Sequence, residues 1–150
     1  MNFRIDVELP AAAETIWTVF FDVRRVALLI PGCENVVETA ALTGYSAVMK
    51  QKIGPFRIDV PTAIVVEERD EPRRVKVHAT GRDRITGTTL DVLLAVALEA
   101  LPEAGTRLGV DATMQVAGRL ASLGYPVVKK KSEELFAEFE KRLRAELGLA

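Results

Sequence analysis

Polar and apolar side chains alternate over the first nine residues. A period of two predicts a strand over residues 3–9 with one buried face. After Pro10 the apolar positions 16, 19, 20 and 23 recur at helical spacing, so a helix is expected there, with Pro10 in its first turn. A second short helix, which carries Val26, Leu29 and Ile30, is expected to end at Pro31.

Between residues 34 and 117 the period is again two, and glycine or proline marks the turns. The expected strands cover residues 34–41, 44–54, 56–68, 73–81, 86–101 and 106–117. In the last two strands one face is almost purely aliphatic and the other is polar, which predicts an antiparallel sheet packed on one side only. Pro61 cannot donate a ladder hydrogen bond, so a bulge or a free edge is expected there.

Helical spacing returns after Gly124 and predicts a helix of about twenty residues that ends at Gly148. Its apolar stripe is Val128, Leu135, Phe139, Leu143 and Leu147. An apolar sheet face must be covered, and this helix is the one long enough to cover it. The sequence therefore predicts an α+β fold with the order β-α-α-β6-α, in which a curved antiparallel sheet wraps around the C-terminal helix.

Composition narrows the class of protein. A length of 150 residues suits a single domain spanning residues 1–150. The 20 Lys and Arg against 21 Asp and Glu leave no basic field, which argues against nucleic acid as a partner. The uncharged apolar runs at residues 26–33 and 92–98 are too short to span a membrane, and one cysteine excludes an internal disulfide. A soluble, cytoplasmic protein is expected.

The sequence contains few side chains suited to catalysis or to metal binding. One cysteine and one histidine are too few for a zinc site. A cysteine nucleophile would need Cys33 beside His78, but Cys33 follows a Pro-Gly turn where a buried structural residue fits. His78 shares a strand face with Arg74 and Lys76, so a surface position is expected. We expect no catalytic residue, no metal and no resident cofactor.

Several motifs together resemble the CoxG family of carbon monoxide dehydrogenase subunits, within the START-like, Bet v 1-like superfamily. They are Glu14-Thr15-Ile16-Trp17, Asp22, residues 26–34 with Ile30-Pro31-Gly32-Cys33-Glu34, Lys52-Ile53-Gly54-Pro55, the pair Gly81 and Gly87, and Gly118-Arg119-Leu120-Ala121-Ser122-Leu123-Gly124.

The resemblance implies the helix-grip fold and a non-catalytic accessory protein that helps recruit a molybdenum hydroxylase to the membrane. For some members it also implies a cavity that holds a quinone or lipid. The sequence departs from the family at Val23, where a proline is common, and at Pro61-Thr62, where a small glycine is common. Longer members continue into a C-terminal tail, whereas this sequence ends at Ala150, so anchoring by a tail is not expected.

A cavity between the sheet and the C-terminal helix would suit a hydrophobic small molecule carried as cargo. Its candidate walls are Phe20, Leu28, Met49, Phe56, Ile58, Leu94, Met114, Leu120, Leu123, Tyr125 and Phe136. The alternative is that these side chains pack as ordinary core. Two other functions fit the same fold: a small polyketide cyclase-like enzyme, which would need acid and base groups facing the cavity, and a structural docking subunit with a filled core.

Two surface features complete the prediction. Lys129, Lys130 and Lys131 fall in the first turns of the last helix, where the helix macrodipole disfavours cations. They are candidates for contact with anionic lipid headgroups or an acidic partner, with a solvated helix face as the alternative. On the outer side of one strand, Leu93, Ala95 and Ala97 form an apolar strip that is a candidate surface for a homodimer or for enzyme docking.

Overall fold

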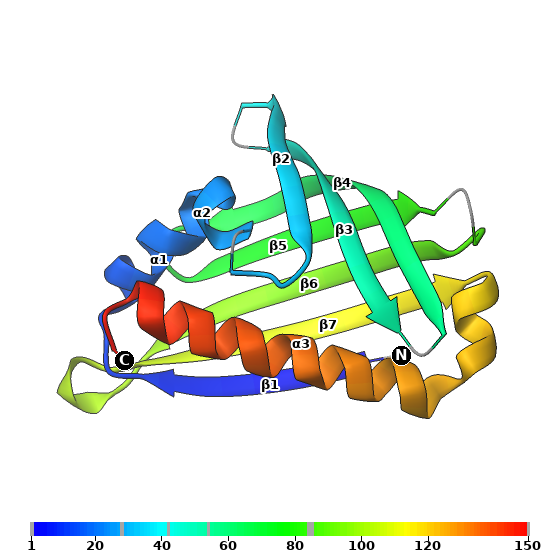
Figure 1. Ribbon diagram of the computed structural model, residues 1–150. Helices are drawn as coiled ribbons and strands as arrows, with labels where there is room; N and C mark the ends of the chain where they lie inside the picture. The colour runs from blue at the N-terminus through cyan, green and yellow to red at the C-terminus, as the bar shows by residue number, and fades with distance from the viewer. Residues whose placement is uncertain (1, 28, 42, 54, 84–85, 150) are drawn as a thin grey trace.

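The computed structural model describes residues 2–27, 29–41, 43–53, 55–83 and 86–149. Within these residues, seven strands form one sheet in the order β1-β7-β6-β5-β4-β3-β2, and every neighbouring pair is antiparallel (Figure 1). The strands are β1 (Asn2–Leu9), β2 (Cys33–Ala40), β3 (Gly44–Ile53), β4 (Phe56–Asp70), β5 (Arg74–Arg82), β6 (Thr89–Ala100) and β7 (Thr106–Ala117). The helices are α1 (Ala13–Phe21), α2 (Val23–Ala27), the 3-10 turns η1 (Pro102–Ala104) and η2 (Arg119–Leu123), and α3 (Tyr125–Glu146).

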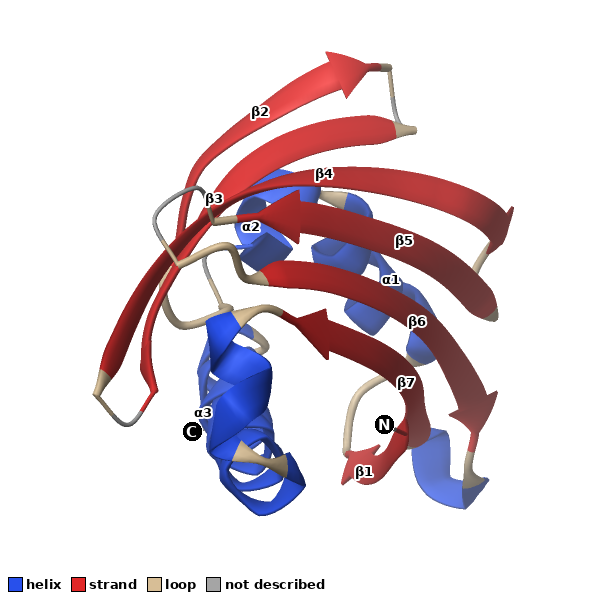
Figure 2. Cartoon of the chain, turned by 90° about the vertical axis from the view of Figure 1, so that its right-hand side faces the viewer, coloured by secondary structure: helices blue, strands red, loops and turns tan. Residues whose placement is uncertain are grey.

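The sheet curves around α3, as Figure 2 shows along the length of the helix. We call the face toward α3 the inner face and the opposite face the outer face. Paired residues in the β-ladder share a face, so Leu108 and its partners Val7 and Leu98 all point inward. The α+β helix-grip architecture expected from the sequence is therefore the one observed.

Two hydrophobic clusters hold the inner face. The first joins β1, α1, β6, β7 and the end of α3, and it includes the fully buried side chains Leu9, Ile16, Val19 and Leu143. The second is smaller and consists of Ile53, Ile58 and Val60, with Met49, Leu90, Val116 and Leu123 packed against it. The first cluster ties both termini of the chain into one core.

The strand boundaries agree with the expected ones except at the start of β6, and the boundaries of α1 and α2 also differ. The helix α1 begins at Ala13, so the expectation that Pro10 lies in its first turn was wrong. The helix α2 ends at Ala27, which leaves Leu29 and Ile30 in the following turn. Strand β6 begins at Thr89 because a tight turn precedes it, in which the Asp83 amide donates to the Thr88 carbonyl at 2.8 Å.

Pro61 lies in β4 just beyond the end of the β4–β5 ladder, whose first pair is Thr62 with Gly81. On the other side, Pro61 pairs in register with Val48 of β3 and no bulge interrupts that ladder. The expected free side of the strand is therefore present, and it accommodates the missing N–H.

Two glycines of the family-like motifs allow close approaches of the backbone. Gly32 has φ of +82°, and a Cβ placed there would lie 2.0 Å from the Lys50 carbonyl oxygen. Gly118 has φ of +88°, and its Cβ would lie 2.4 Å from the Gly87 carbonyl oxygen. Both positions combine a left-handed conformation with a neighbouring backbone that cannot move aside, so glycine is required.

Leu143 is the fully buried anchor of α3 in the first cluster, with 0% of its surface exposed. We expect Leu143→Ala to lower the free energy of unfolding by about 3 kcal/mol, because it removes buried methyl groups and leaves a cavity. Urea unfolding followed by circular dichroism measures this. Val65→Ala, on the exposed outer face, is the control and should change stability by less than about 1 kcal/mol. Equal effects of the two substitutions would contradict the placement of the core.

Candidate functional site

A row of apolar side chains crosses the middle of the inner face. The β-ladder register aligns Ile64 of β4 with Ala79 of β5, Ala79 with Val92 of β6, and Val92 with Met114 of β7. We call these four residues the inner strip. Paired residues on neighbouring strands lie side by side on one face, so the strip is a continuous apolar band across four strands.

The inner strip is only half-buried, although it lies on the packed side of the sheet. Among the described residues, the two hydrophobic clusters and the partly buried side chains packed against them include none of the four. The first cluster closes the inner face toward one end of the strands and the second closes it toward the other. In the described part of the chain, the strip is therefore a partly buried apolar band between two packed regions.

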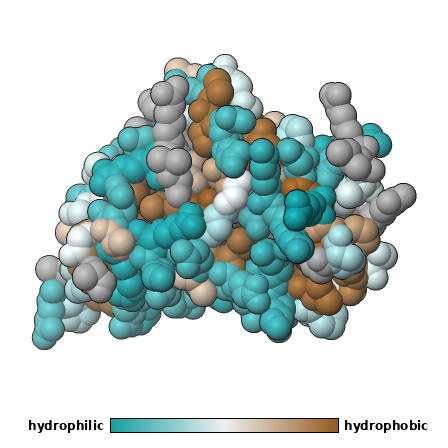
Figure 3. Space-filling view, viewed as in Figure 1, coloured by the Kyte–Doolittle hydropathy of each residue, from teal (hydrophilic) through white to brown (hydrophobic). Residues whose placement is uncertain are grey.

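The surface on the helix side of the molecule is mixed in polarity. Figure 3 shows apolar surface in several places among the hydrophilic side chains of this face. In the ribbon view α3 crosses near β1 and β7, and β2 crosses in front of β5 (Figure 1). A partly buried apolar surface of this kind suits an apolar ligand.

The structure distributes the predicted wall residues over three places. Met114 belongs to the inner strip, and Leu94, two residues along β6 from Val92, packs against the first cluster. Ile58 is part of the second cluster, and Met49 and Leu123 pack against it. Phe20 and Phe136 pack against the first cluster, where the Phe20 ring lies 6.2 Å from the ring of Phe139.

The remaining predicted wall residues lie at the margins. Phe56 is half-buried and pairs with Ile53 at the start of β4. Tyr125 is the first residue of α3 and is 50% exposed. Leu28 and the side chain of Leu120 lie outside the described residues. The role of all these residues in ligand binding stays a prediction.

The sequence analysis missed Ile64, Ala79 and Val92, which form most of the strip. The alternation of apolar and polar residues in β4 and β5 does mark them as inward-facing positions. It does not tell which inward-facing positions are covered by helices, because that depends on where α1 and α3 cross the sheet. These residues are therefore found by combining the register of the β-ladder with the burial of each side chain.

Polar groups on the inner face are already engaged. The hydroxyl of Thr62 donates to the Val60 carbonyl at 2.9 Å, and that of Ser132 on α3 donates to the Val128 carbonyl at 2.9 Å. Thr106, which is fully buried, donates to the Ala11 carbonyl at 2.7 Å. Hydroxyls bonded to the backbone satisfy the polar groups without creating a charged or reactive site.

Tyr45 is a deeply placed polar group of the inner face, with 4% of its surface exposed. Burial raises the pKa of its hydroxyl above the usual value, and the charge of Glu38 and the hydrogen bond to that carboxylate raise it further. Glu38 lies opposite Tyr45 in the β2–β3 ladder, which explains the contact. Tyr45 therefore keeps its proton and serves as a hydrogen-bond donor rather than as a base.

Cys33 and His78 lie on opposite faces of the sheet. Cys33 pairs with Met49, which points inward, whereas His78 pairs with Val65 and Leu93, which point outward. The His78 ring contacts Asp91, with 2.8 Å between Nε2 and Oδ1. The sheet separates the thiol from the imidazole, so they cannot act together as nucleophile and base. Among the described residues, no group of three or more His, Cys, Asp or Glu is arranged to hold a metal ion.

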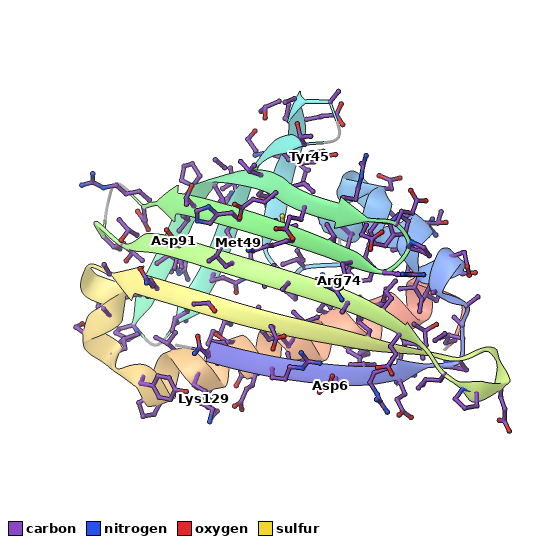
Figure 4. All side chains as sticks on the ribbon, turned by 180° about the vertical axis from the view of Figure 1, so that it is seen from behind. Asp6, Tyr45, Met49, Arg74, Asp91 and Lys129 are labelled. Atoms are coloured by element: carbon purple, nitrogen blue, oxygen red, sulfur yellow. The ribbon has the colours of Figure 1, made fainter. Side chains whose placement is uncertain are left out.

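The outer face carries charged side chains around the predicted apolar strip. Figure 4 shows this face from behind, with Arg74, Asp91 and Asp6 labelled. Ala95 and Ala97 are exposed, and Leu93 is half-buried next to the His78 pair. The strip thus lies on the outer face as expected, and its use as an interface stays a prediction.

Within the described ranges, each helix is too short or too polar to span a lipid bilayer.

Cys33 is half-buried at the start of β2, where full burial was expected. Burial raises the pKa of the thiol above its usual value, and the negative charge of Glu34 adds to this. Less thiolate is present at pH 8 than for an ordinary cysteine, so we expect Ellman's reagent to react with the native protein about tenfold more slowly than with the protein unfolded in urea. Equal rates in the two states would show that Cys33 is an accessible, ordinary thiol.

Comparison with known proteins agrees with the geometry. The family model for CoxG, a subunit of carbon monoxide dehydrogenase, matches residues 5–148. No curated protein matches the sequence. Among solved structures, a conserved protein from Geobacillus kaustophilus has a TM-score of 0.90 and 19% identity over 99% of this chain and 95% of that one.

A START superfamily protein from Mycobacterium smegmatis has a TM-score of 0.73 and 17% identity, covering 98% of this chain and 97% of that one. A protein from Thermus thermophilus has a TM-score of 0.72 and 14% identity over the same shares of the two chains. At these identities the structures show the fold, which is START-like. The match to the family model extends over nearly the whole sequence, and the chain belongs to the CoxG family of carbon monoxide dehydrogenase subunits.

Proposed function

We propose that the protein is a non-catalytic accessory protein that carries a hydrophobic small molecule, a quinone or a lipid, on the inner strip. In this proposal it serves a molybdenum hydroxylase and brings that enzyme and its membrane-borne ligand together. The observation that carries the proposal is the half-buried inner strip between two packed clusters. Membership of the CoxG family supports the link to the enzyme.

The energetics favour an apolar occupant. Burying the exposed part of such an aliphatic side chain contributes up to about 1 kcal/mol. Ile64, Val92 and Met114 are each partly exposed, and the hydroxyl of Thr62, two residues from Ile64, is bonded to the backbone. A ligand that covers the strip gains from apolar contact and does not have to displace charged groups from the floor.

Two titratable side chains of the sheet, Tyr45 and His78, argue against the cyclase-like alternative. A cyclase needs a base or acid that faces its substrate with a suitable pKa. Tyr45 is held protonated by its surroundings, and His78 points to the outer face. A docking subunit with a filled core is the other alternative, and the partly exposed inner strip, which belongs to neither packed cluster, argues against it.

The proposal treats residues 1–150 as one carrier domain. Strand β1, from the start of the chain, pairs with β7, and the first cluster joins β1 and α1 to the end of α3. Removal of either end would expose the core against which the ligand face is built, so binding and folding should be lost together.

Native mass spectrometry of gently purified protein, followed by solvent extraction, tests the carrier function directly. We expect a stoichiometric quinone or lipid to be released. A protein that is empty and takes up no added quinone or lipid would contradict the proposal and favour a docking subunit. Co-purification of a molybdenum hydroxylase from the source cells tests the partner separately.

Ala79→Phe fills the inner strip with an aromatic ring, so we expect it to weaken uptake of an added quinone about tenfold or more by competing for the same apolar surface. Ala95→Phe is the matched control, because it makes the same substitution on the exposed outer face of β6. Uptake is measured by fluorescence quenching, and circular dichroism checks that both variants fold. If both variants bind like the unmodified protein, the inner strip is not the binding site.

A further inference from the structure

Apolar side chains are exposed where α3 begins. The large hydrophobic residues that are exposed in the described chain are Val37, Val65, Tyr125 and Val127. Tyr125 is 50% exposed and Val127 40% exposed, and Pro126 between them is exposed as well. Two of the four thus occur within three consecutive residues. Neighbouring exposed apolar side chains of this kind are a candidate surface for an apolar or interfacial partner.

Lysines follow on the next turn of the same helix. Lys129 and Lys130 are exposed and Lys131 is half-buried. The Lys129 ammonium lies 5.9 Å from the centre of the Tyr125 ring and 3.9 Å from a Glu133 carboxylate oxygen. For Lys130 and Lys131 the described part of the chain shows no ion pair. Since the whole chain has a net charge of −1, this positive charge is local.

The spacing joins the two features into one surface. Residues four apart lie on the same side of a helix, which places Lys129 next to Tyr125 and Lys131 next to Val127. Val128 and Ser132 point the other way and are buried against the protein. Figure 4 shows Lys129 at the margin of the molecule, on the first turns of α3. We call residues 125–131 the α3 tip.

We propose that the α3 tip docks on the surface of an anionic phospholipid bilayer. The aromatic ring of Tyr125 and the side chain of Val127 enter the interfacial layer, and the three lysines bind the headgroup phosphates. An acidic protein would also attract the lysines. The lipid surface is favoured because the exposed tyrosine and valine match the apolar interior of a bilayer and the neighbouring lysines match its anionic headgroups.

The α3 tip also lies at one end of the inner face. It follows directly on η2, whose Leu123 packs against the second cluster together with Met49 and Val116. Docking by the tip would place this end of the inner face toward the bilayer. This last step rests on the proposed carrier function, whereas lipid binding by the tip does not.

Co-sedimentation with vesicles tests the docking. We expect the unmodified protein to bind vesicles of phosphatidylcholine and phosphatidylglycerol, and to bind phosphatidylcholine alone much more weakly. K129E/K130E/K131E should weaken binding to the anionic vesicles at least about a hundredfold, since each lysine near such a surface contributes roughly a fivefold gain. Tyr125→Ser with Val127→Ser, which keeps the lysines, should weaken it about tenfold.

The matched control is R73E/R74E/K141E, which makes the same change of charge at exposed positions away from the tip. We expect it to keep binding within about threefold. The proposal is overturned if the unmodified protein shows no preference for anionic vesicles, if the tip variant binds as well as the unmodified protein, or if the control loses as much as the tip variant. Circular dichroism confirms that each variant folds.

Quinone uptake by the same variants separates the two proposals. We expect K129E/K130E/K131E to take up quinone as the unmodified protein does, because the lysines lie outside the inner strip. Loss of vesicle binding with normal uptake supports docking by the tip. Vesicle binding that survives in Ala79→Phe, when that variant has lost uptake, supports a tip that works independently of the cargo site.

Discussion

The constraint on which this structure depends is that a seven-stranded sheet has one large apolar face and the described part of the chain supplies one long helix, α3, to cover it. Exposed apolar surface is costly, so the sheet curves until its inner face meets α3 (Figure 2). Leu143 and the side chains around it secure the end of the helix in the first cluster. A helix is about 10 Å wide, however, and cannot cover every strand of a broad sheet. The middle of β4, β5 and β6 therefore keeps a half-buried apolar surface.

This incomplete cover connects folding with function. A fully packed inner face would be more stable but would leave no site for a ligand, whereas an open one has lower stability and can bind an apolar molecule. The chain limits this loss of stability because its inner hydroxyls are bonded to the backbone and Tyr45 is paired with Glu38. Under the proposed carrier function, ligand binding would complete the core and so couple occupancy to stability through mass action.

The motifs that mark the family serve the backbone more than the chemistry. Gly32 and Gly118 stand where a side chain would collide with a neighbouring carbonyl. Between the motif glycines Gly81 and Gly87, Asp83 holds the turn before β6 and accepts a hydrogen bond from the Asp59 amide at 3.1 Å. These positions fix how α2 joins β2 and how β7 joins η2. Recognition of the family from its motifs therefore identifies the fold more sharply than the proposed cargo.

The sequence by itself determined the order of elements, the one-sided sheet and the long amphipathic helix, because periods of two and of about 3.6 residues are local properties of the chain. It also determined that Leu108 and Leu98 face the core and that Lys129 to Lys131 sit at a helix start. The helix boundaries near Pro10 and Leu29 depended on turns that the local pattern does not specify. Only the tertiary structure decided which inward-facing residues stay partly exposed. Ile64, Ala79, Val92 and Met114 come from four strands, and their alignment follows from ladder register and from where α3 crosses the sheet, which no single segment encodes.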